Sequence, residues 1–253
     1  MTLLPETTMT GRRVLVTGGA SGIGLACAAM LAARGARVAV LDRDAAALAA
    51  LALDRVTGHQ ADVADSAMVQ AAVDGAALAM GGIDGVICAA GIDHEQPLDQ
   101  IDDAGWARSI GVNLTGPMLT ARASLPHLRA AGGGAMVFVS SAAGLMPIAG
   151  RAAYCAAKAG LVMLGKSLAM ELAADGIRVN SICPGAIDTP LFRTSWEPRP
   201  DPQAALEHIR ARYALGRIGT PDEIAGAVLW LLGPEAGYVT GIALAVDGGR
   251  SFH

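Results

Sequence analysis

Apolar and polar residues follow two alternating patterns along the chain from residue 13 onward. Short runs rich in Val, Ile and Leu are separated by longer stretches in which Ala and Leu recur at helical spacing. Strands that alternate with helices in this way form βαβ units, whose strands align in a parallel sheet. The pattern predicts an α/β fold with one doubly wound sheet of about seven parallel strands flanked by helices. The expected strands are Arg13–Thr17, Arg37–Leu41, Val56–Gln60, Gly85–Cys88, Ala135–Ser140, Arg178–Cys183 and Ile242–Val246, and the expected helices are Gly22–Arg34, Ser66–Met80, a long one through Trp106–Ala130, Ala152–Ala174 and Pro221–Leu232.

One segment departs from this pattern. No linker divides the chain, so residues 1–253 are expected to form a single domain, but the stretch DTPLFRTSWEPRPDPQ at 188–203 contains four prolines. Proline removes a backbone donor and interrupts regular elements, so an irregular stretch is expected there. Long irregular stretches inside a compact domain are usually functional. We expect a mobile lid at about residues 188–213, with Phe192 and Trp196 facing the substrate.

Composition narrows the classes of function. Hydrophobic residues make up 53% of the chain, but no apolar run reaches the roughly 18 residues of a membrane span. The net charge of −4, with scattered Arg residues, argues against nucleic acid as a partner. Cys27, Cys88, Cys155 and Cys183 form no CxxC pair, so we expect free thiols, no metal site and a cytoplasmic location. The opening MTLLPETTMTGRR has no long apolar region, so no signal peptide is expected.

The stretch VLVTGGASGIGLA places an expected strand, a glycine loop and a helix in direct succession. Gly18, Gly22 and Gly24 remove Cβ where the backbone turns or approaches a ligand, and the helix N-terminus offers N–H groups to a pyrophosphate. A tight turn without a ligand would use the same glycines. Asp42 favours a ligand, because it ends the next strand about 20 residues on, where a carboxylate can bind adenosine ribose hydroxyls. Asp62 is a second candidate, for the adenine side or as a helix N-cap. These features are typical of a Rossmann-type dinucleotide-binding domain.

A second pattern lies in the segment YCAAK. Tyr154 and Lys158 are four residues apart in an expected helix, so both side chains lie on one helix face. The chain has two Lys, Lys158 and Lys166, against seventeen Arg, which indicates that position 158 needs a compact ammonium rather than a guanidinium. A free Tyr titrates near ~10. A neighbouring ammonium, joined by the positive ring of an oxidised nicotinamide, is expected to lower the pKa of Tyr154 and make it a general acid/base.

Together these motifs resemble those of the classical short-chain dehydrogenase/reductase family, over essentially the whole chain. The resemblance rests on TGGASGIG, VNLTG, the Ser at 141, YCAAK, CPGAIDTP and the terminal VDGG. It implies an NAD-dependent oxidoreductase that transfers a hydride between nicotinamide and a secondary alcohol or ketone. It assigns catalysis to Asn113, Ser141, Tyr154 and Lys158. The implied cofactor residues are Gly18, Ser21, Gly22, Ile23, Gly24, Asp42, Arg43, Asp62, Val63, Ala90, Gly91, Tyr154, Lys158, Pro184, Gly185, Ile187 and Thr189, and the expected substrate contacts are Ser141, Tyr154, His94, Phe192 and Trp196.

Within the family, Ser141 would bond the substrate oxygen, Asn113 would anchor a water joined to Lys158, and Thr189 would bond the nicotinamide carboxamide. The resemblance also implies a homotetramer with the helix at 152–174 in one interface. Cys88 stands where the family usually has Asn, which removes one local bond near the adenosine side. Asp42 would repel a 2′-phosphate, so NAD is expected over NADP, although Arg43 follows immediately and would pair with a phosphate if it turned inward.

Other functions remain open on the same fold. A 3-oxoacyl thioester reductase is one alternative, although no Arg cluster in the sequence marks acyl-carrier or CoA binding. A catalytically silent NAD-binding regulator is another, although such a protein is expected to have lost Tyr154, Lys158 or Ser141. Enoyl reductases of this superfamily have a wider Tyr–Lys spacing, and sugar-nucleotide epimerases have a different glycine pattern and a longer chain.

Overall fold

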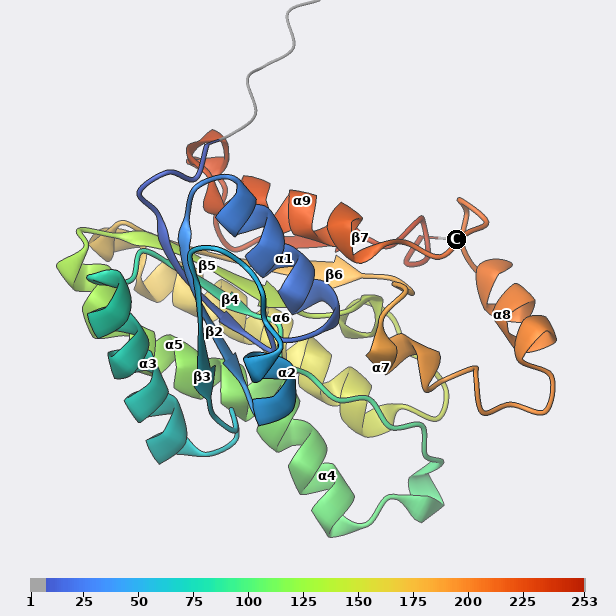
Figure 1. The fold of residues 1–253 in the computed structure, drawn as a ribbon. Coiled ribbons are helices and arrows are strands. Elements are labelled where there is room, and N and C mark those ends of the chain that lie inside the picture. Colours follow the sequence, from blue (N-terminus) through green and yellow to red (C-terminus); the bar gives the residue numbers. More distant parts are fainter. Residues whose placement is uncertain (1–7, 253) are drawn as a thin grey trace, which may run out of the picture.

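The computed structural model describes residues 8–252, and its centre is one seven-stranded parallel sheet with helices on both faces (Figure 1). The order β3-β2-β1-β4-β5-β6-β7 reverses between β1 and β4. Open α/β sheets bind ligands at the carboxyl ends of the strands, near such a reversal. The expected Rossmann-type doubly wound sheet is confirmed. The strands are β1 (Arg13–Thr17), β2 (Arg37–Asp42), β3 (Val56–Gln60), β4 (Gly85–Cys88), β5 (Gly134–Val139), β6 (Ile177–Pro184) and β7 (Ala243–Val246).

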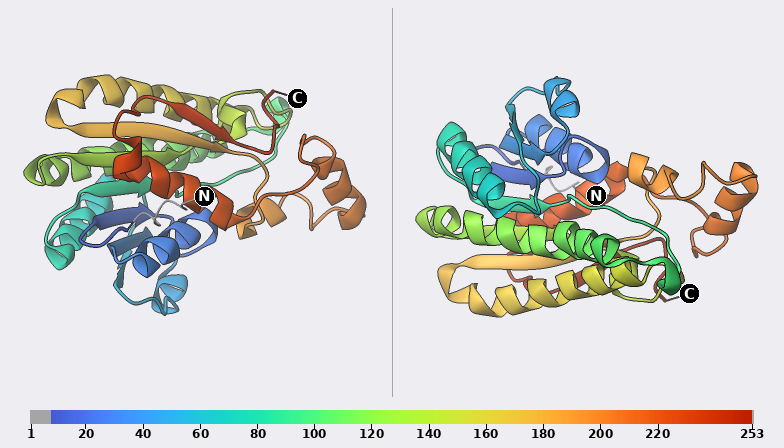
Figure 2. Two further views of the ribbon diagram at one scale, coloured as in Figure 1. Left: turned by 90° about the horizontal axis from the view of Figure 1, so that it is seen from above. Right: turned by 90° about the horizontal axis from the view of Figure 1, so that it is seen from below.

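The helices cover the sheet in two layers, seen from above and below in Figure 2. Side chains of successive strand residues point to opposite faces. In β1, Val14 and Val16 therefore pack into the apolar cluster with α1 and α9, while Leu15 packs into the cluster with α3, α5 and α6. The helices are α1 (Gly22–Ala33), α2 (Ala45–Ala49), α3 (Ser66–Met80), α4 (Asp103–Ile110), α5 (Gly116–Ala130), α6 (Ala152–Glu171), α7 (Pro190–Arg193), α8 (Pro202–Arg210) and α9 (Pro221–Leu232).

The structure corrects the expectation that prolines keep the segment at 188–203 irregular, because this segment contains α7 and the start of α8. Pro190 and Pro202 stand in the first turn of these helices, where the missing N–H has no intrahelical partner to lose. The preceding residues cap each helix: Thr189 Oγ1 accepts from Phe192 N at 3.2 Å, and Asp201 Oδ1 accepts from Ala204 N at 3.0 Å. Proline here starts two short helices.

The expected long helix through 106–130 is also interrupted. A π-helical turn, Gly111–Thr115, separates α4 from α5. Such wide turns are frequently found at functional sites, and this one contains the fully buried Asn113.

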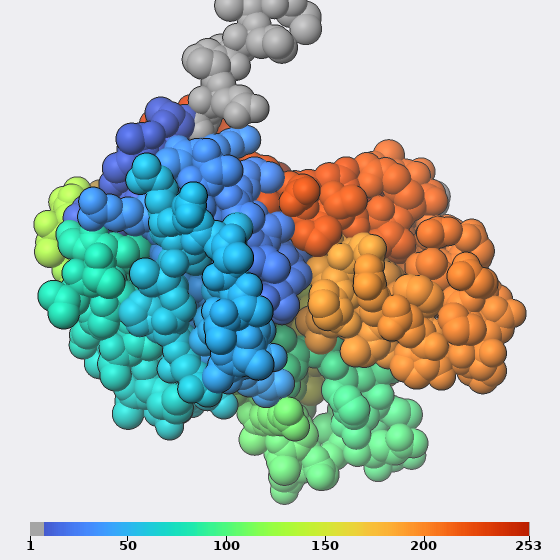
Figure 3. Space-filling model, in the orientation of Figure 1, coloured from blue at the N-terminus to red at the C-terminus, as the bar shows by residue number. Residues whose placement is uncertain are grey.

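Residues 188–213, which we call the lid segment, lie on the surface at the carboxyl-end side of the sheet. In the space-filling view this orange segment lies above the green residues that follow β4 (Figure 3). Over residues 8–252, no helix is long and apolar enough to cross a membrane, and no His, Cys, Asp and Glu side chains gather as a metal site.

Candidate active site

The glycine loop after β1 packs closely against the loop that follows β4. Gly18 has a φ of +66°, and a Cβ there would lie 2.6 Å from Cα of Ala90. Gly22 has a φ of +52°, and a Cβ there would lie 3.2 Å from the Thr189 methyl group. Only glycine adopts such backbone without strain. The expected cofactor residues Gly18, Gly22, Ala90 and Thr189 are thus brought together at one place.

The N-terminus of α1 fits an anion. Ser21 stands at the N-cap position, but its side chain makes no capping hydrogen bond, and the first turn contains no acidic residue. Backbone N–H groups of the first helical turn lack intrahelical partners and carry partial positive charge. Ser21, Gly22, Ile23 and Gly24 therefore surround a suitable place for a pyrophosphate.

Asp42 lies at the carboxyl end of β2 with its carboxylate held by backbone groups. Its Oδ2 accepts from Ala20 N at 3.1 Å, and its Oδ1 accepts from Asp44 N at 3.1 Å. Each carboxylate oxygen can accept a further bond, so the group is oriented while acceptor capacity remains. Arg43 is exposed and contributes its carbonyl oxygen to Gln60 at 3.3 Å.

Asp62 follows β3, where its Oδ1 accepts from Ala64 N at 2.9 Å. The alternative interpretation of Asp62 as a helix N-cap is wrong, because Asp65 caps α3 by accepting from Ala67 N and Met68 N. Asp62 stabilises the turn before that helix. Its role toward adenine stays a prediction.

Asn113 joins the π-helical turn to the loop after β4. Its Nδ2 donates to Ile92 O at 2.9 Å, and its Oδ1 accepts from Ile92 N at 3.1 Å. The amide thereby satisfies both backbone groups of one residue, which fixes the loop. A Cβ on Gly91 would lie 3.1 Å from Asn113 Oδ1 and 3.6 Å from Lys158 Nζ. The side chains of Asn113 and Lys158 therefore border the same small space beside Gly91.

Lys158 is buried, with only 4% of its surface exposed. Its Nζ donates to Val139 O at 2.9 Å, and its own carbonyl accepts from Ser140 Oγ at 2.9 Å. The ammonium lies 5.7 Å from the centroid of the Tyr154 ring. Burial lowers the pKa of Lys158 from an ordinary value of 10.5 to about 8, because it penalises the charged form. The hydroxyl of Ser140, the residue before Ser141, is thus bonded to the backbone of α6.

Tyr154 differs from expectation. Burial raises the pKa of Tyr154, while a hydrogen bond with Ser141 and the positive charge of Arg151 act in the opposite direction. The expected lowering by Lys158 is not found; in this state only Ser141 and Arg151 oppose the rise in the pKa of the phenol. Ser141 Oγ also accepts from Ala143 N at 3.1 Å, so its hydroxyl proton is oriented away from that amide. The structure therefore places Ser141 and Tyr154 together, as predicted.

The segment at the end of β6 and beyond it borders the site opposite the loop after β4. Pro184, Ile187 and Thr189 are buried. A Cβ on Gly185 would lie 2.7 Å from the Tyr213 ring, and Ala186 N donates to Tyr213 Oη at 2.9 Å. The lid segment is thereby attached at its far end to the Pro-Gly turn.

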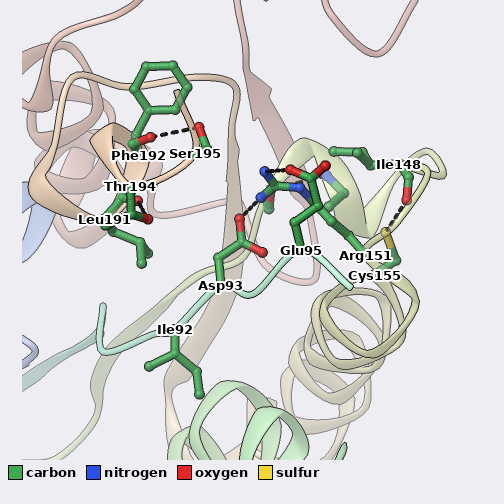
Figure 4. Close-up of polar contacts among 12 residues, drawn as sticks. Ile92, Asp93, Glu95, Ile148, Arg151, Cys155, Leu191, Phe192, Thr194 and Ser195 are labelled. Atoms are coloured by element: carbon green, nitrogen blue, oxygen red, sulfur yellow. Dashed lines mark hydrogen bonds and ion pairs between the residues drawn. The ribbon is translucent and has the colours of Figure 1, made fainter. Parts of the chain in front are cut away.

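Sequence reasoning missed a cluster of four charged residues beside Tyr154. Arg151, at the N-cap position of α6, is ion-paired to Asp93, and its Nη2 lies 3.5 Å from Glu95 Oε2 (Figure 4). Arg199, from the lid segment, approaches the same oxygen at 2.8 Å. Asp93 and Glu95 follow β4, Arg151 precedes α6 and Arg199 lies in the lid segment, and no motif marks the four as a group. His94, which was expected to contact the substrate, is exposed between the two acids.

Phe192 and Trp196 line a cavity of about 620 Å³ between α7, α8 and the loop before α9. The residues that line it do not include Asn113, Ser141, Tyr154 or Lys158. Contact of the two aromatics with a substrate stays a prediction. The lining residues are Asp188, Phe192, Arg193, Trp196, Glu197, Leu206, Glu207, Arg210, Gly216, Arg217, Ile218, Gly219 and Thr220.

Comparison with known proteins shows the family to which the chain belongs. A family model described as enoyl-(acyl carrier protein) reductase matches residues 18–251. The chain is 42% identical to cis-4-hydroxycyclohexanecarboxylate dehydrogenase of Sinomonas cyclohexanicum, over 94% of this chain and 96% of the relative. It is 39% identical to D-threitol dehydrogenase of Mycolicibacterium smegmatis, over 94% of this chain and 92% of the relative. The crystal structure of levodione reductase superposes with a TM-score of 0.91 at 35% identity, covering 96% of this chain and 98% of that one.

The chain therefore belongs to the classical short-chain dehydrogenase/reductase family. It is an oxidoreductase that acts on the CH–OH group of a secondary alcohol, or on the corresponding ketone.

Proposed function

We propose that this protein uses NAD(H) rather than NADP(H) to interconvert a small secondary alcohol and its ketone. The observation that carries the choice of cofactor is the position of Asp42 at the carboxyl end of β2, with both oxygens oriented by backbone N–H groups. A fixed carboxylate accepts bonds from a free 2′-hydroxyl and repels a 2′-phosphate. The glycine loop from Thr17 to Gly24 contains no basic residue that would offset this repulsion.

The residues present fit a nicotinamide dinucleotide. Gly18, Gly22 and the start of α1 would hold the pyrophosphate, Asp42 the adenosine ribose, and Thr189 the nicotinamide end. When bound, the nicotinamide supplies the hydride acceptor for the carbinol carbon, or the hydride donor for the ketone.

The chain's own residues manage the proton. Tyr154 Oη would take the alcohol proton in oxidation or return it in reduction, and Ser141 would hold the substrate oxygen next to it. Lys158 is held by Val139 O at 2.9 Å, and Asn113 braces the adjoining loop through Ile92. Held by these bonds, Lys158 and Asn113 would form a polar, ordered region next to the phenol of Tyr154, through which the proton could be exchanged.

For the substrate we propose a small ring-borne or polyhydroxylated alcohol. The relatives named for 4-hydroxycyclohexanecarboxylate and for D-threitol, each aligned over 94% of this chain, support this class. A 3-oxoacyl thioester reductase remains the second candidate, since the matching family model is described by an acyl-carrier substrate. A panel of cyclohexanol, 4-hydroxycyclohexanecarboxylate, D-threitol and an acetoacetyl thioester separates the two by nicotinamide absorbance.

The cofactor choice is tested by the ratio of catalytic efficiencies with NAD and NADP. We expect NAD to be favoured clearly, and a ratio below one would overturn the proposal. In Asp42→Ala the KM for NAD should rise roughly tenfold, because charge-assisted hydrogen bonds are lost, and the ratio should narrow. Asp54→Ala, on the exposed turn before β3, is the matched control and should keep the wild-type ratio.

We further propose a homotetramer located in the cytoplasm. Met163 and Met170 on α6 are 62% and 87% exposed, and large apolar side chains on a helix surface favour burial between subunits. All four cysteines are free thiols, which is consistent with a reducing compartment. Light scattering on the purified protein tests the assembly: a monomeric mass would contradict it.

A further inference from the structure

The two arginines near Tyr154 converge on a single carboxylate oxygen. Arg151 Nη2 and Arg199 Nη2 lie 3.5 and 2.8 Å from Glu95 Oε2. They come from different parts of the fold, the start of α6 and the lid segment, as Figure 4 shows for the Arg151 side. A place where two guanidinium groups meet around one carboxylate matches the recognition of a carboxylate by Arg.

The four members differ in how firmly they are held. The side chains of Arg151 and Asp93 are 16% and 17% exposed, and they are ion-paired with each other. Glu95 and Arg199 are 45% and 49% exposed. Exposed ion pairs add little to stability, so Glu95 can turn into solvent at small cost while Asp93 keeps Arg151 in place.

The cluster also borders the reacting atoms. Arg151 stands at the N-cap position of α6, three residues before Tyr154. The charge of Arg151 acts on the phenols of Tyr154 and Tyr213, and Arg199 meets Arg151 at Glu95 Oε2. A molecule whose hydroxyl contacts Tyr154 would therefore have two guanidinium groups beside it, where its other end could bind.

We propose that Arg151 and Arg199 recognise a carboxylate carried by the substrate at a distance from its reacting hydroxyl, and that Glu95 occupies this place in the free protein. This inference rests on the proposed function, because it names the substrate class of the same site: hydroxy acids whose two groups are separated by a ring or by a chain of similar length.

The first experiment compares 4-hydroxycyclohexanecarboxylate with its neutral carboxamide in the wild type and in Arg199→Gln. Arg199 is half exposed, so its replacement should not affect folding. We expect KM for the carboxylate to rise about tenfold, since one charge-assisted bond is lost, with kcat unchanged. KM for the carboxamide should stay within a factor of about two. Arg212→Gln is the matched control, because Arg212 is also an exposed arginine of the lid segment but lines neither the cavity nor the charged cluster; neither substrate should be affected.

The second experiment removes the internal carboxylate. In Glu95→Gln the two arginines lose their competing partner, so the carboxylate substrate should bind more tightly, with KM lowered severalfold. A rise in that KM, or an equal change for carboxylate and carboxamide, would show that the cluster only fastens the lid segment, and would overturn the proposal.

The third experiment needs no turnover. Calorimetric titration of the protein with cyclohexanecarboxylate, in the presence of NAD, should show binding that is weakened about tenfold in Arg199→Gln and unchanged in Arg212→Gln. Absence of such a difference contradicts the carboxylate site. If every alcohol of the panel fails to react while this difference is present, the proposed reaction fails and the carboxylate site stands.

Discussion

The two walls of the active site are held by different kinds of bonds. On the sheet side, Asn113 and Lys158 are buried, and their polar groups bond backbone atoms of Ile92 and Val139 at 2.9 to 3.1 Å. On the lid side, Arg193 and Arg199 are about half exposed and bond the carboxylates of Asp188 and Glu95.

This difference has an energetic meaning. Breaking a buried polar pair leaves an unsatisfied group in a low-dielectric interior and costs about 1–3 kcal/mol or more. Exposed ion pairs exchange readily for water or for another ion. We therefore expect the sheet wall to set the reaction type, and the wall whose bonds are easily replaced to set the choice of substrate.

The largest effect is expected from a substitution at Tyr154, on the sheet side of the site. Tyr154→Phe keeps the ring but removes the proton donor, so kcat should fall by roughly two to four orders of magnitude. NADH affinity, measured by fluorescence titration, should be largely preserved. Tyr238→Phe, at a fully exposed position, is the control and should behave as the wild type. Retention of more than about a tenth of the wild-type kcat contradicts the role of general acid/base.

A second test uses the buried charge of Lys158. Its pKa is lowered to about 8 in the folded protein from an ordinary value of 10.5. Below pH 8 Lys158 is protonated in both the folded and the unfolded protein, so the folded protein bears the full cost of burying the ammonium. Between these two values the unfolded chain keeps a proton that the folded protein has released, so stability rises with pH.

In Lys158→Met the side chain is unbranched, one atom shorter and does not titrate. From pH 7.5 to 10.5 the wild type should therefore gain up to ~3 kcal/mol in free energy of unfolding relative to this variant. Urea unfolding at several pH values measures the difference. The exposed Lys166→Met serves as the control, and its difference from the wild type should stay constant. A flat difference for Lys158→Met would show that the ammonium is not buried as described.

A smaller effect is expected on the lid side. Trp196→Ala and Phe192→Ala should raise KM roughly tenfold and change the rank order of substrates, while NADH affinity stays nearly unchanged. Trp230→Ala, on α9 and 39% exposed, is the control. Unchanged rank order in both variants would assign the cavity beside α7 and α8 no part in substrate binding.

The smallest effect is a change in mobility. We expect the lid segment to open without ligand and to close over cofactor and substrate. Trypsin cleavage after Arg193 should therefore be severalfold slower with NADH and substrate present; the bond after Arg199 is unsuitable because Pro200 follows it. Equal cleavage rates would indicate a rigid lid segment.

The sequence was sufficient for the sheet. Strands β1, β3 and β4 have the expected limits, and the others differ by one residue at one or both ends. Tyr154 and Lys158 lie four residues apart in α6, so their closeness follows from helix geometry. Asn113 lies in the π-helical turn and Ser141 follows β5, and both were named from the family resemblance. The catalytic roles of these four residues stay predictions.

The features that the sequence did not predict depend on how the chain packs. The two short helices of the lid segment were missed because proline was taken as a breaker, although Thr189 and Asp201 were suitable caps before it. Arg151, Asp93 and Arg199 belong to segments separated by many residues, and single charges carry no periodic signal. The pKa of Tyr154 could not be anticipated because it is set mainly by burial, which only the folded structure determines.

The π-helical turn at Gly111–Thr115 makes the spacing between α4 and α5 sensitive to chain length. Each residue added to or removed from a helix rotates everything beyond it by about 100°. A deletion within the turn would give a longer, more regular α-helix, yet it would rotate Asn113 away from Ile92 or α5 away from the sheet. Insertions and deletions here should therefore be less tolerated than substitutions, and a better helix would make a poorer enzyme.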